Sequence, residues 1–409
     1  MKLITHRLAR ASLIAIGVAA AASAGPEHGQ AQSQSQSQGQ SQGQNQSQGQ
    51  GQGQNQNSYT VTNLTSDMPG VAPNTDPVLQ NAWGVAFAPG GAFWIADNQT
   101  GCSTLYDGTG AVVPLQFKIP LPGGVIPPTA CVNNNPQSPS NPTPAAPTGL
   151  VWNATTTFVV PGTNTPAVFI FDTEDGTISA WAPGLNPPDQ AVLAVDNSSN
   201  AVYKGLAFGT NPQGVFLFAA NFKAGTVDAF APNGSNGFQS ATPAQIPGGF
   251  TDPNIPAGFA PFGIQNIDGD LFVTYAQQDA AKANDVPGQG AGFVDVFDTS
   301  GNLLQRFAQH GLLNAPWGVA RASFAFGRFS GDILVGNFGD GLINVFDSAG
   351  NFVDTLKDST GKSIVIPGLW TLTLGGGSKS TSDTVYFTAG PNDEADGLFG
   401  TITPASSGQ

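Results

Sequence analysis

Histidine and glutamate are scarce in this sequence, with three copies of each among 409 residues. The histidines, His6, His28 and His310, are far apart in the chain, and the only glutamates beyond the N-terminal region are Glu174 and Glu394. Neither a histidine dyad nor a zinc site with histidine ligands can therefore be assembled. This argues against enzymes that depend on paired histidines or on histidine-bound zinc.

Basic residues are also few, with 13 lysines and arginines against 27 aspartates and glutamates. Lys2, Arg7 and Arg10 precede all the acidic residues, so the rest of the chain carries a formal charge of −17. Without a basic stripe the protein gains nothing from neutralising phosphates, and nucleic acid is excluded as a partner. The acidity fits an exported protein or one that attracts cations, and equally the acidic turns of an aspartate-rich β protein.

No apolar run in the sequence is long enough to span a membrane. The best candidate, residues 11–21, follows the three basic residues and precedes the small residues 22–24, which is the pattern of a signal peptide. We expect cleavage of residues 1–24 near Ala24 and export to the periplasm or the medium. Residues 25–57 are almost entirely Gln, Ser, Gly and Asn and are predicted to form a disordered tether.

Only two cysteines are present, Cys102 and Cys131. An even number of cysteines in an exported chain predicts a disulfide. No histidine lies near either cysteine in the sequence, which argues against a reactive thiol. Closing a loop of this length contributes about 3–4 kcal/mol to stability on the chain-entropy model.

Helix signals are missing after the leader, because no segment has a sustained period of 3.6 residues and the chain contains 53 glycines and 32 prolines. A different pattern recurs six times: an aromatic residue, glycine and apolar residues, then a second apolar run ending in Asn and Gly. The clearest copies begin at Trp83 and Trp317. The corresponding strand-start positions are 53 to 65 residues apart, and they are Gly84, Gly149, Gly205, Gly263, Gly318 and Thr371. This period suits a four-stranded antiparallel blade, so the fold class is all-β, a six-bladed β-propeller.

The propeller is predicted to span residues 58–403, followed by a disordered tail over residues 404–409. The sixth repeat contains only three strand patterns, within residues 370–402, whereas residues 58–64 alternate as an isolated strand. We expect this N-terminal strand to complete the last blade as its outermost strand and to close the ring. The alternative is a loose N-terminal arm.

Several segments resemble a known family, and they are Asn81–Ala86, Thr173–Trp181, Gly258–Asn266, Gly292–Asp298 and Ala389–Glu394. They resemble an uncharacterised group of exported bacterial proteins related to NHL-repeat six-bladed propellers. The resemblance covers about residues 59–402 and implies a fold but no catalytic residues. Some members of that group carry a PEP-CTERM sorting tail, and residues 406–409 do not match one.

Six-bladed propellers usually bind ligands at the mouth of the central channel, where the inner strands begin. The candidate ligand-binding residues at that face are Trp83, Asn98, Asn221, Phe262, Trp317, Asn337, Trp370 and Asn392. A hard cation such as Ca²⁺ would require oxygen ligands, for which the candidates are Asp97, Asn221, Asn337 and Asp393. The alternative is that the aromatic residues pack the blades together and the asparagines satisfy turns.

Three functions remain open. The leading hypothesis is an exported, monomeric binding or scaffold module that engages a protein, a glycan, a matrix component or a small ligand. The second is a hydrolase or lyase that depends on a divalent cation and acts on a small ester or lactone. Calcium lactonases with this fold have a glutamate at the start of the first inner strand, a position that neither Glu174 nor Glu394 occupies. The third is a surface protein that assembles through its Gln/Ser-rich head.

Overall fold

The structure is a computed structural model that describes residues 58–133 and 143–405. The predicted signal peptide and tether and residues 406–409 lie outside the described residues. Residues 404 and 405, which were expected in the tail, are ordered: Pro404 ends the last strand, and the Ala405 amide donates a hydrogen bond to the Ser58 carbonyl at 2.8 Å. Within the described residues no helix has the length and hydrophobicity needed to cross a membrane.

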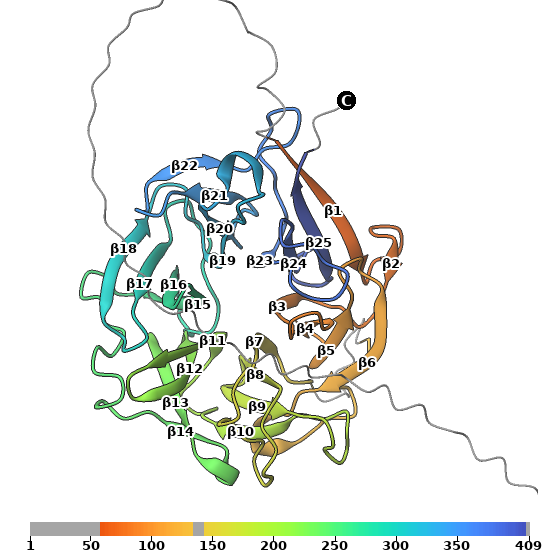
Figure 1. Cartoon of the computed structure of the whole chain (residues 1–409), viewed down its shortest axis with the longest axis vertical. Helices are drawn as coiled ribbons and strands as arrows, with labels where there is room; N and C mark the ends of the chain where they lie inside the picture. The colour runs from red at the N-terminus through yellow and green to blue at the C-terminus, as the bar shows by residue number, and fades with distance from the viewer. Residues whose placement is uncertain (1–57, 134–142, 406–409) are drawn as a thin grey trace, which may run out of the picture. The chain divides into compact units, whose positions relative to one another are not determined.

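Six antiparallel sheets form a ring, as the repeat predicted, and the first strand of each repeat lies nearest the axis (Figure 1). The first blade contains β3 (Ala82–Ala86), β4 (Phe93–Asp97), β5 (Cys102–Tyr106) and β6 (Val112–Lys118). The second contains β7 (Pro147–Trp152), β8 (Phe169–Thr173), β9 (Thr177–Trp181) and β10 (Val192–Asp196). The third contains β11 (Tyr203–Asn211), β12 (Gly214–Asn221), β13 (Thr226–Pro232) and β14 (Phe238–Ser240).

The remaining blades repeat this order along the chain. The fourth contains β15 (Phe259–Ile267), β16 (Asp270–Gln277), β17 (Phe293–Phe297) and β18 (Leu303–Gln309). The fifth contains β19 (Pro316–Arg321), β20 (Ile333–Asn337), β21 (Ile343–Phe346) and β22 (Phe352–Thr355). The sixth contains β23 (Leu369–Leu374), β24 (Val385–Ala389) and β25 (Leu398–Pro404). The described helical segments are three single 3₁₀ turns, Pro122–Gly124, Gly234–Asn236 and Gly327–Phe329.

The N-terminal strand closes the ring, so this prediction is confirmed. β1 (Tyr59–Ser66) pairs antiparallel with β25, with Tyr59 opposite Pro404 and Ser66 opposite Leu398. The two-residue strand β2 (Asn74–Thr75) adds parallel to β1 on the outside, which the sequence pattern did not indicate. The closure joins the two ends of the described chain within one sheet.

The recurrence of glycine at the strand starts has a steric cause in how the blades meet. A Cβ atom on Gly149 would overlap the backbone nitrogen of Leu206 in the next blade, and one on Gly84 would overlap the carbonyl of Thr148. Glycine therefore lets adjacent inner strands approach closely around the channel. Gly205 is less constrained, because its nearest neighbour would lie 3.3 Å away.

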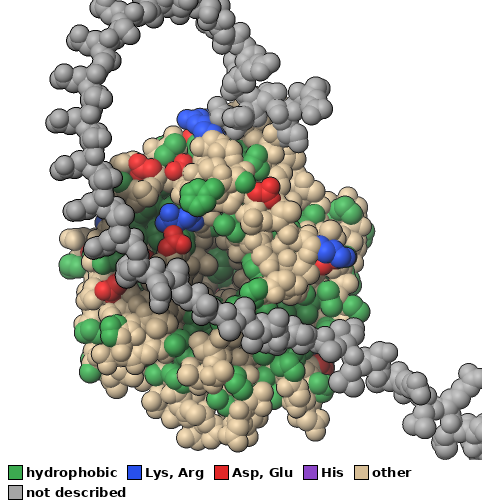
Figure 2. Space-filling model, viewed as in Figure 1, with side chains coloured by type: hydrophobic (Ala, Val, Ile, Leu, Met, Phe, Trp, Pro, Cys, Tyr) green, Lys and Arg blue, Asp and Glu red, His purple; other side chains and the backbone are tan. Residues whose placement is uncertain are grey.

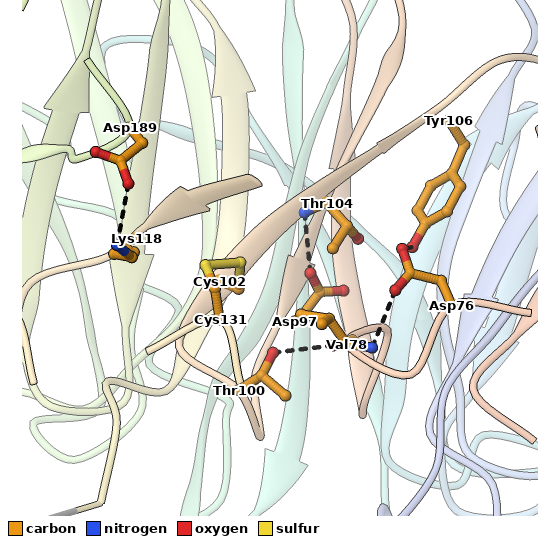
Figure 3. The surroundings of a disulfide bond; sticks show 10 residues. All are labelled: Asp76, Val78, Asp97, Thr100, Cys102, Thr104, Tyr106, Lys118, Cys131 and Asp189. Atoms are coloured by element: carbon orange, nitrogen blue, oxygen red, sulfur yellow. Dashed lines mark hydrogen bonds and ion pairs between the residues drawn. A yellow bond between two sulfur atoms is a disulfide. The ribbon is translucent and has the colours of Figure 1, made fainter. Parts of the chain in front are cut away.

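Cys102 and Cys131 form the predicted disulfide, which fastens the segment after β6 to the start of β5 (Figure 3). The Cys131 amide also donates a hydrogen bond to the Thr100 carbonyl at 2.9 Å.

The surface carries few charges, because only 10% of the residues in the sequence are charged. On the face drawn in Figure 2, uncharged side chains predominate and the charged ones stand singly or in small groups.

Candidate binding site at the mouth of the central channel

Charged side chains converge at the end of the channel where the inner strands begin. Lys204 is the second residue of β11, and Glu174 follows β8 in the neighbouring blade. Glu394 follows β24, and Asp285 lies in the loop between β16 and β17. Together with Asn81 and Asn98, these four residues are called the channel mouth below. Both glutamates of the described chain are therefore at one site.

A chain of hydrogen bonds joins the two glutamates through a pair of asparagines. The Nδ2 of Asn81 donates to Glu394 Oε2 at 2.7 Å and lies 3.3 Å from Asn98 Oδ1. Asn98 Nδ2 donates to Glu174 Oε2 at 3.0 Å. The side-chain oxygen Oδ1 of Asn81 accepts a hydrogen bond from Trp370 Nε1 at 2.9 Å. These bonds hold both carboxylates in place on the first, second and sixth blades.

Lys204 provides the positive charge of the channel mouth, although it is only 2% exposed. Its ammonium group forms an ion pair with Glu174, whose side chain is 26% exposed. The Nζ atom also lies 5.2 Å from the ring centroid of Trp83 and 5.7 Å from that of Phe222, distances typical of cation–π contacts. Within the described chain Glu174 is the single hydrogen-bond acceptor for this ammonium group.

Burial is the main influence on the pKa values of the other two acids, Asp285 and Glu394. Burial raises the pKa of Asp285 to about 6, and the charge of Lys204 partly opposes this shift. The Oδ2 atom of Asp285 is buried and has no hydrogen-bond partner among the described residues. Burial also raises the pKa of Glu394, and the hydrogen bond from Asn81 opposes that shift. The mouth therefore contains carboxyl groups that hold a proton more readily than exposed ones.

The backbone that presents Glu394 is strained. Asn392, Asp393 and Glu394 have φ angles of 57°, 56° and 66°, and Asn81 opposite them has a φ of 46°. A left-handed conformation costs roughly 1–2 kcal/mol for each residue other than glycine. Such strain persists only where the surrounding structure enforces it, and it is concentrated at functional sites.

An aromatic layer closes the channel beneath the mouth. Trp83, Phe262 and Trp370 are at most 1% exposed, and the rings of Trp83 and Trp370 stack at 3.5 Å. Trp317 is half-buried, packs edge-on against Trp83, and donates from Nε1 to the Lys204 carbonyl at 2.8 Å. The three buried rings face one another, as expected for blade packing, and are covered from solvent. Deeper along the channel a cavity is lined by inner-strand residues, among them Val85, Leu150, Leu206, Ile264, Val319 and Leu372.

The asparagines predicted as ligand-binding residues do not lie together in the structure. Asn98 belongs to the channel mouth, whereas Asn221 and Asn337 serve the turns at the ends of β12 and β20. Asn221 Nδ2 donates to Asp228 at 2.9 Å, and Asn337 Nδ2 donates to the Leu312 carbonyl at 2.7 Å. Asn392 is exposed, and its Nδ2 donates to Asp396 at 2.7 Å.

The four predicted metal ligands lie in four different blades. Asp97 is fully buried in the first blade, where its Oδ2 accepts a hydrogen bond from the Thr104 amide at 2.9 Å (Figure 3). Asp393 is exposed in the sixth, and the two asparagines bond within their turns as described. In residues 58–133 and 143–405, no three His, Cys, Asp or Glu side chains are close enough to hold a metal ion. The calcium site stays a prediction.

Sequence reasoning missed four site residues: Lys204, Glu174, Asp285 and Asn81. A signal for the lysine was present, because the residue before the strand-start position is aromatic in four repeats. It is Thr148 in the second repeat and Lys204 in the third. A lysine at a position that otherwise carries Trp or Phe is a departure from the packing pattern.

The fold and the charged mouth define a six-bladed β-propeller with a polar site at one end of its channel. Two relatives come from Acanthamoeba polyphaga mimivirus. Uncharacterized protein R648 is 31% identical over 352 residues, which are 84% of this chain and 79% of that protein. Uncharacterized protein L690 is 29% identical over 354 residues, covering 84% and 86%. The chain belongs to the family of R648.

These relatives are viral, so they do not support the bacterial affiliation expected from the sequence. No family model matches the chain. Among solved structures, a streptogramin B lyase aligns with a TM-score of 0.46 and 11% identity over 85% of this chain and 98% of its own. A PQQ-bound aldose sugar dehydrogenase from Streptomyces coelicolor aligns with a TM-score of 0.45 and 14% identity over the same shares. Both likenesses are too distant to bear on function.

Proposed function

We propose that this propeller is a binding module whose ligand occupies the channel mouth. The observation that carries the proposal is the convergence of Glu174 and Glu394 with the buried Lys204, although the three residues come from different blades. Glutamate makes up only three of the 27 acidic residues in the sequence. Two of these three glutamates meet at one end of the channel, which indicates that this end has a specific role in binding.

Stability alone gives little reason for this arrangement. Desolvating an ion pair offsets much of its attraction, and an apolar residue of similar size is often equally stable in its place. The equivalent positions of four other blades carry Trp83, Phe262, Trp317 and Trp370. The strained turn that presents Glu394 adds a further cost. These costs are accounted for if the charged groups serve a ligand.

The ligand is a protein, a glycan, a matrix component or a small molecule that meets the protein outside the cytoplasm. Export is supported by the basic residues and the short apolar stretch that precede Ala24. A monomer suffices for this function, because every residue of the mouth comes from one chain.

A second candidate is a hydrolase or lyase that depends on a divalent cation. It is favoured by the buried Asp285 Oδ2, which lacks a hydrogen-bond partner among the described residues, although no three carboxyl groups of the mouth are close enough together to hold a metal ion. A bound cation would act as a Lewis acid toward an ester or lactone carbonyl. Calcium titration by calorimetry tests this candidate, and heat that persists in Glu394→Gln would place the cation elsewhere.

The binding proposal is tested by thermal melts of the chain after residue 24 against a ligand library. A ligand that binds only the folded state raises the melting temperature. We expect at least one ligand to stabilise the wild-type protein but not Glu174→Gln or Glu394→Gln. Asp279→Asn removes a partly exposed charge from the loop that carries Asp285 and is the matched control. Ligands whose stabilisation survives both glutamate substitutions would overturn the proposal.

A further inference from the structure

The central channel contains a cavity on the other side of the aromatic layer from the charged mouth. Each of the six blades contributes one aliphatic residue to its wall, and these are Val85, Leu150, Leu206, Ile264, Val319 and Leu372. Trp83, Phe262 and Trp370 come just before lining residues along the inner strands, so they lie between the cavity and the mouth, where these strands begin. The exposed Gln265 also lines the cavity, near the end of β15. The cavity therefore opens toward the opposite face of the ring.

The size of the cavity limits its occupant to a small group. The centres of water molecules can occupy about 40 Å³ inside it. One water molecule needs roughly 10–15 Å³ on this measure, so the cavity holds about three non-hydrogen atoms. A free molecule of that size binds with a dissociation constant of about 1 mM at best. A ligand that binds more tightly than this must extend beyond the cavity and contact the rim of its opening.

The wall of the cavity is uncharged but offers hydrogen bonds. None of the described residues that line it has a charged side chain. Each inner strand lies at one end of its sheet, so the backbone N–H and C=O groups on its other edge have no strand partner in the described chain. Gly84, Gly149 and Gly318 line the cavity without side chains that would cover these groups. A charged occupant would lose its hydration without gaining a counter-ion, and a wholly apolar one would leave the backbone groups unpaired.

A carboxamide group meets these conditions of size, charge and hydrogen bonding. It contains one carbon, one oxygen and one nitrogen, it is neutral, and its oxygen accepts hydrogen bonds while its nitrogen donates them. All of its polar atoms lie in one plane, which leaves its two faces for contact with the aliphatic side chains.

We propose that the cavity is a second binding site, which receives the side-chain carboxamide of a glutamine from a peptide that lies across the opening. Glutamine is favoured over asparagine because its additional methylene group extends its reach past the rim. The exposed amide of Gln265 at the opening binds the main chain of the peptide. This site is independent of the proposed function, because the charged mouth is on the other side of the aromatic layer.

The test is a titration of a capped peptide into the protein, followed by NMR of the Ile, Leu and Val methyl groups. The probe is Gly-Ser-Gln-Ser-Gly, and two comparison peptides replace its Gln by the charged Glu or by the apolar Met. The protein begins at residue 58, since residues 58–405 contain the complete ring and the glutamines of residues 25–57 are then absent. We expect the Gln peptide to shift the methyl signals of Leu150, Leu206 and Leu372. The Glu and Met peptides should bind about tenfold more weakly or less.

Three substitutions in the protein locate the binding. Val85→Phe fills the cavity from a partly exposed position in its wall and should abolish the methyl shifts. Gln265→Ala removes an exposed side chain, so it tests the site even if Val85→Phe does not fold, and it should weaken binding by about threefold to tenfold. Gln213→Ala is the matched control, because Gln213 is exposed in the turn after β11 and does not line the cavity. This control should leave binding unchanged.

The same titration of the full chain extends the test. A weaker affinity for the Gln peptide there would support the inference and identify residues 25–57 as a competing source of carboxamide groups. Equal binding of all three peptides to the protein that begins at residue 58 would overturn the inference. Binding of the Gln peptide that persists in a folded Val85→Phe and in Gln265→Ala would overturn it as well. So would the absence of any methyl shift, with water alone in the cavity.

Discussion

Asn81 donates a hydrogen bond to Glu394 at 2.7 Å, which links the first blade to the loop after β24 in the last. Both residues have positive φ angles, and Asn81 also accepts a hydrogen bond from Trp370 at 2.9 Å. The Asn81 side chain thus forms hydrogen bonds both to a carboxylate presented by a strained turn and to a buried indole. The contact joins the aromatic layer of the channel to its charged mouth.

Asn81→Asp should destabilise the protein most at high pH. The substitution keeps an acceptor for Trp370 but replaces the donor to Glu394 with a second carboxylate. The free energy of unfolding should fall by about 2–3 kcal/mol at pH 8, as for a buried charged acceptor that loses its donor. The pKa of Glu394 is already raised by burial, so a proton shared between the two carboxyl groups should restore part of the loss near pH 5. Urea unfolding of this variant and of Asn81→Ala at pH 5 and pH 8 provides the measurement, and the alanine variant, which adds no second carboxylate beside Glu394, should recover less at pH 5.

Gly149→Ala should cost far more stability than Gly205→Ala, although both glycines occupy the same position in adjacent blades. The new methyl group on Gly149 would lie 2.6 Å from Asp172 Oδ1 and would overlap the backbone of Leu206. At Gly205 the nearest atom, the Ile264 nitrogen, would lie 3.3 Å away. We expect a loss of about 3 kcal/mol for the first and less than about 1 kcal/mol for the second. Equal losses in chemical unfolding would show that blade spacing does not depend on these glycines.

The fold was predictable because its signals are local and repeated. Glycines before apolar residues mark the inner strands, and the unpaired strand pattern of residues 58–64 indicated how the ring closes. The channel mouth was predicted only in part. Asn337 ends β20 at the position that Asp97 holds in the first blade, so it serves its own turn, whereas Asn98 lies one residue farther along and reaches the mouth.

The pairing of Glu174 with Lys204 depends on the curvature of the ring rather than on a motif. The two residues are on consecutive blades, and the ion pair forms because their loop and strand start meet at the same end of the channel. Asp285 enters through a long loop whose path no repeat pattern specifies. Side chains that come together in this way cannot be identified from the sequence and become visible only in the three-dimensional structure.

Replacing Cys102 and Cys131 together by alanine should lower the free energy of unfolding by about 3–4 kcal/mol, because the unfolded chain then regains the entropy of a 29-residue loop. The comparison is with the wild-type protein under oxidising conditions, followed by urea unfolding. Addition of a reductant should destabilise the wild-type protein and leave the double variant unaffected. A double variant as stable as the oxidised wild type would contradict this role of the disulfide.

The stability of the protein should decrease as pH rises through the range in which Asp172 ionises. Asp172 is fully buried between the second and third blades, and its Oδ1 accepts hydrogen bonds from Thr148 Oγ1 at 2.9 Å and from the Gly149 amide at 2.5 Å. Burial raises its pKa to about 7, and these two hydrogen bonds oppose the shift only in part. The native state therefore binds the proton more tightly than the unfolded chain, whose aspartates titrate near pH 4.

Between about pH 4 and pH 7 the native state holds more protons than the unfolded state, so the free energy of unfolding falls with rising pH. The fall is on the order of 4 kcal/mol over the whole range, at about 1.4 kcal/mol for each pH unit. Asp172→Asn keeps the acceptor for Thr148 and Gly149 and removes the titration, while Asp67, Asp285 and Asp295, whose pKa values burial also raises to about 6, remain. The difference in unfolding free energy between the two proteins, measured in urea at pH 4 and at pH 7, isolates this one residue. The variant should gain relative to the wild type as pH rises, and a constant difference would show that Asp172 does not titrate in this range.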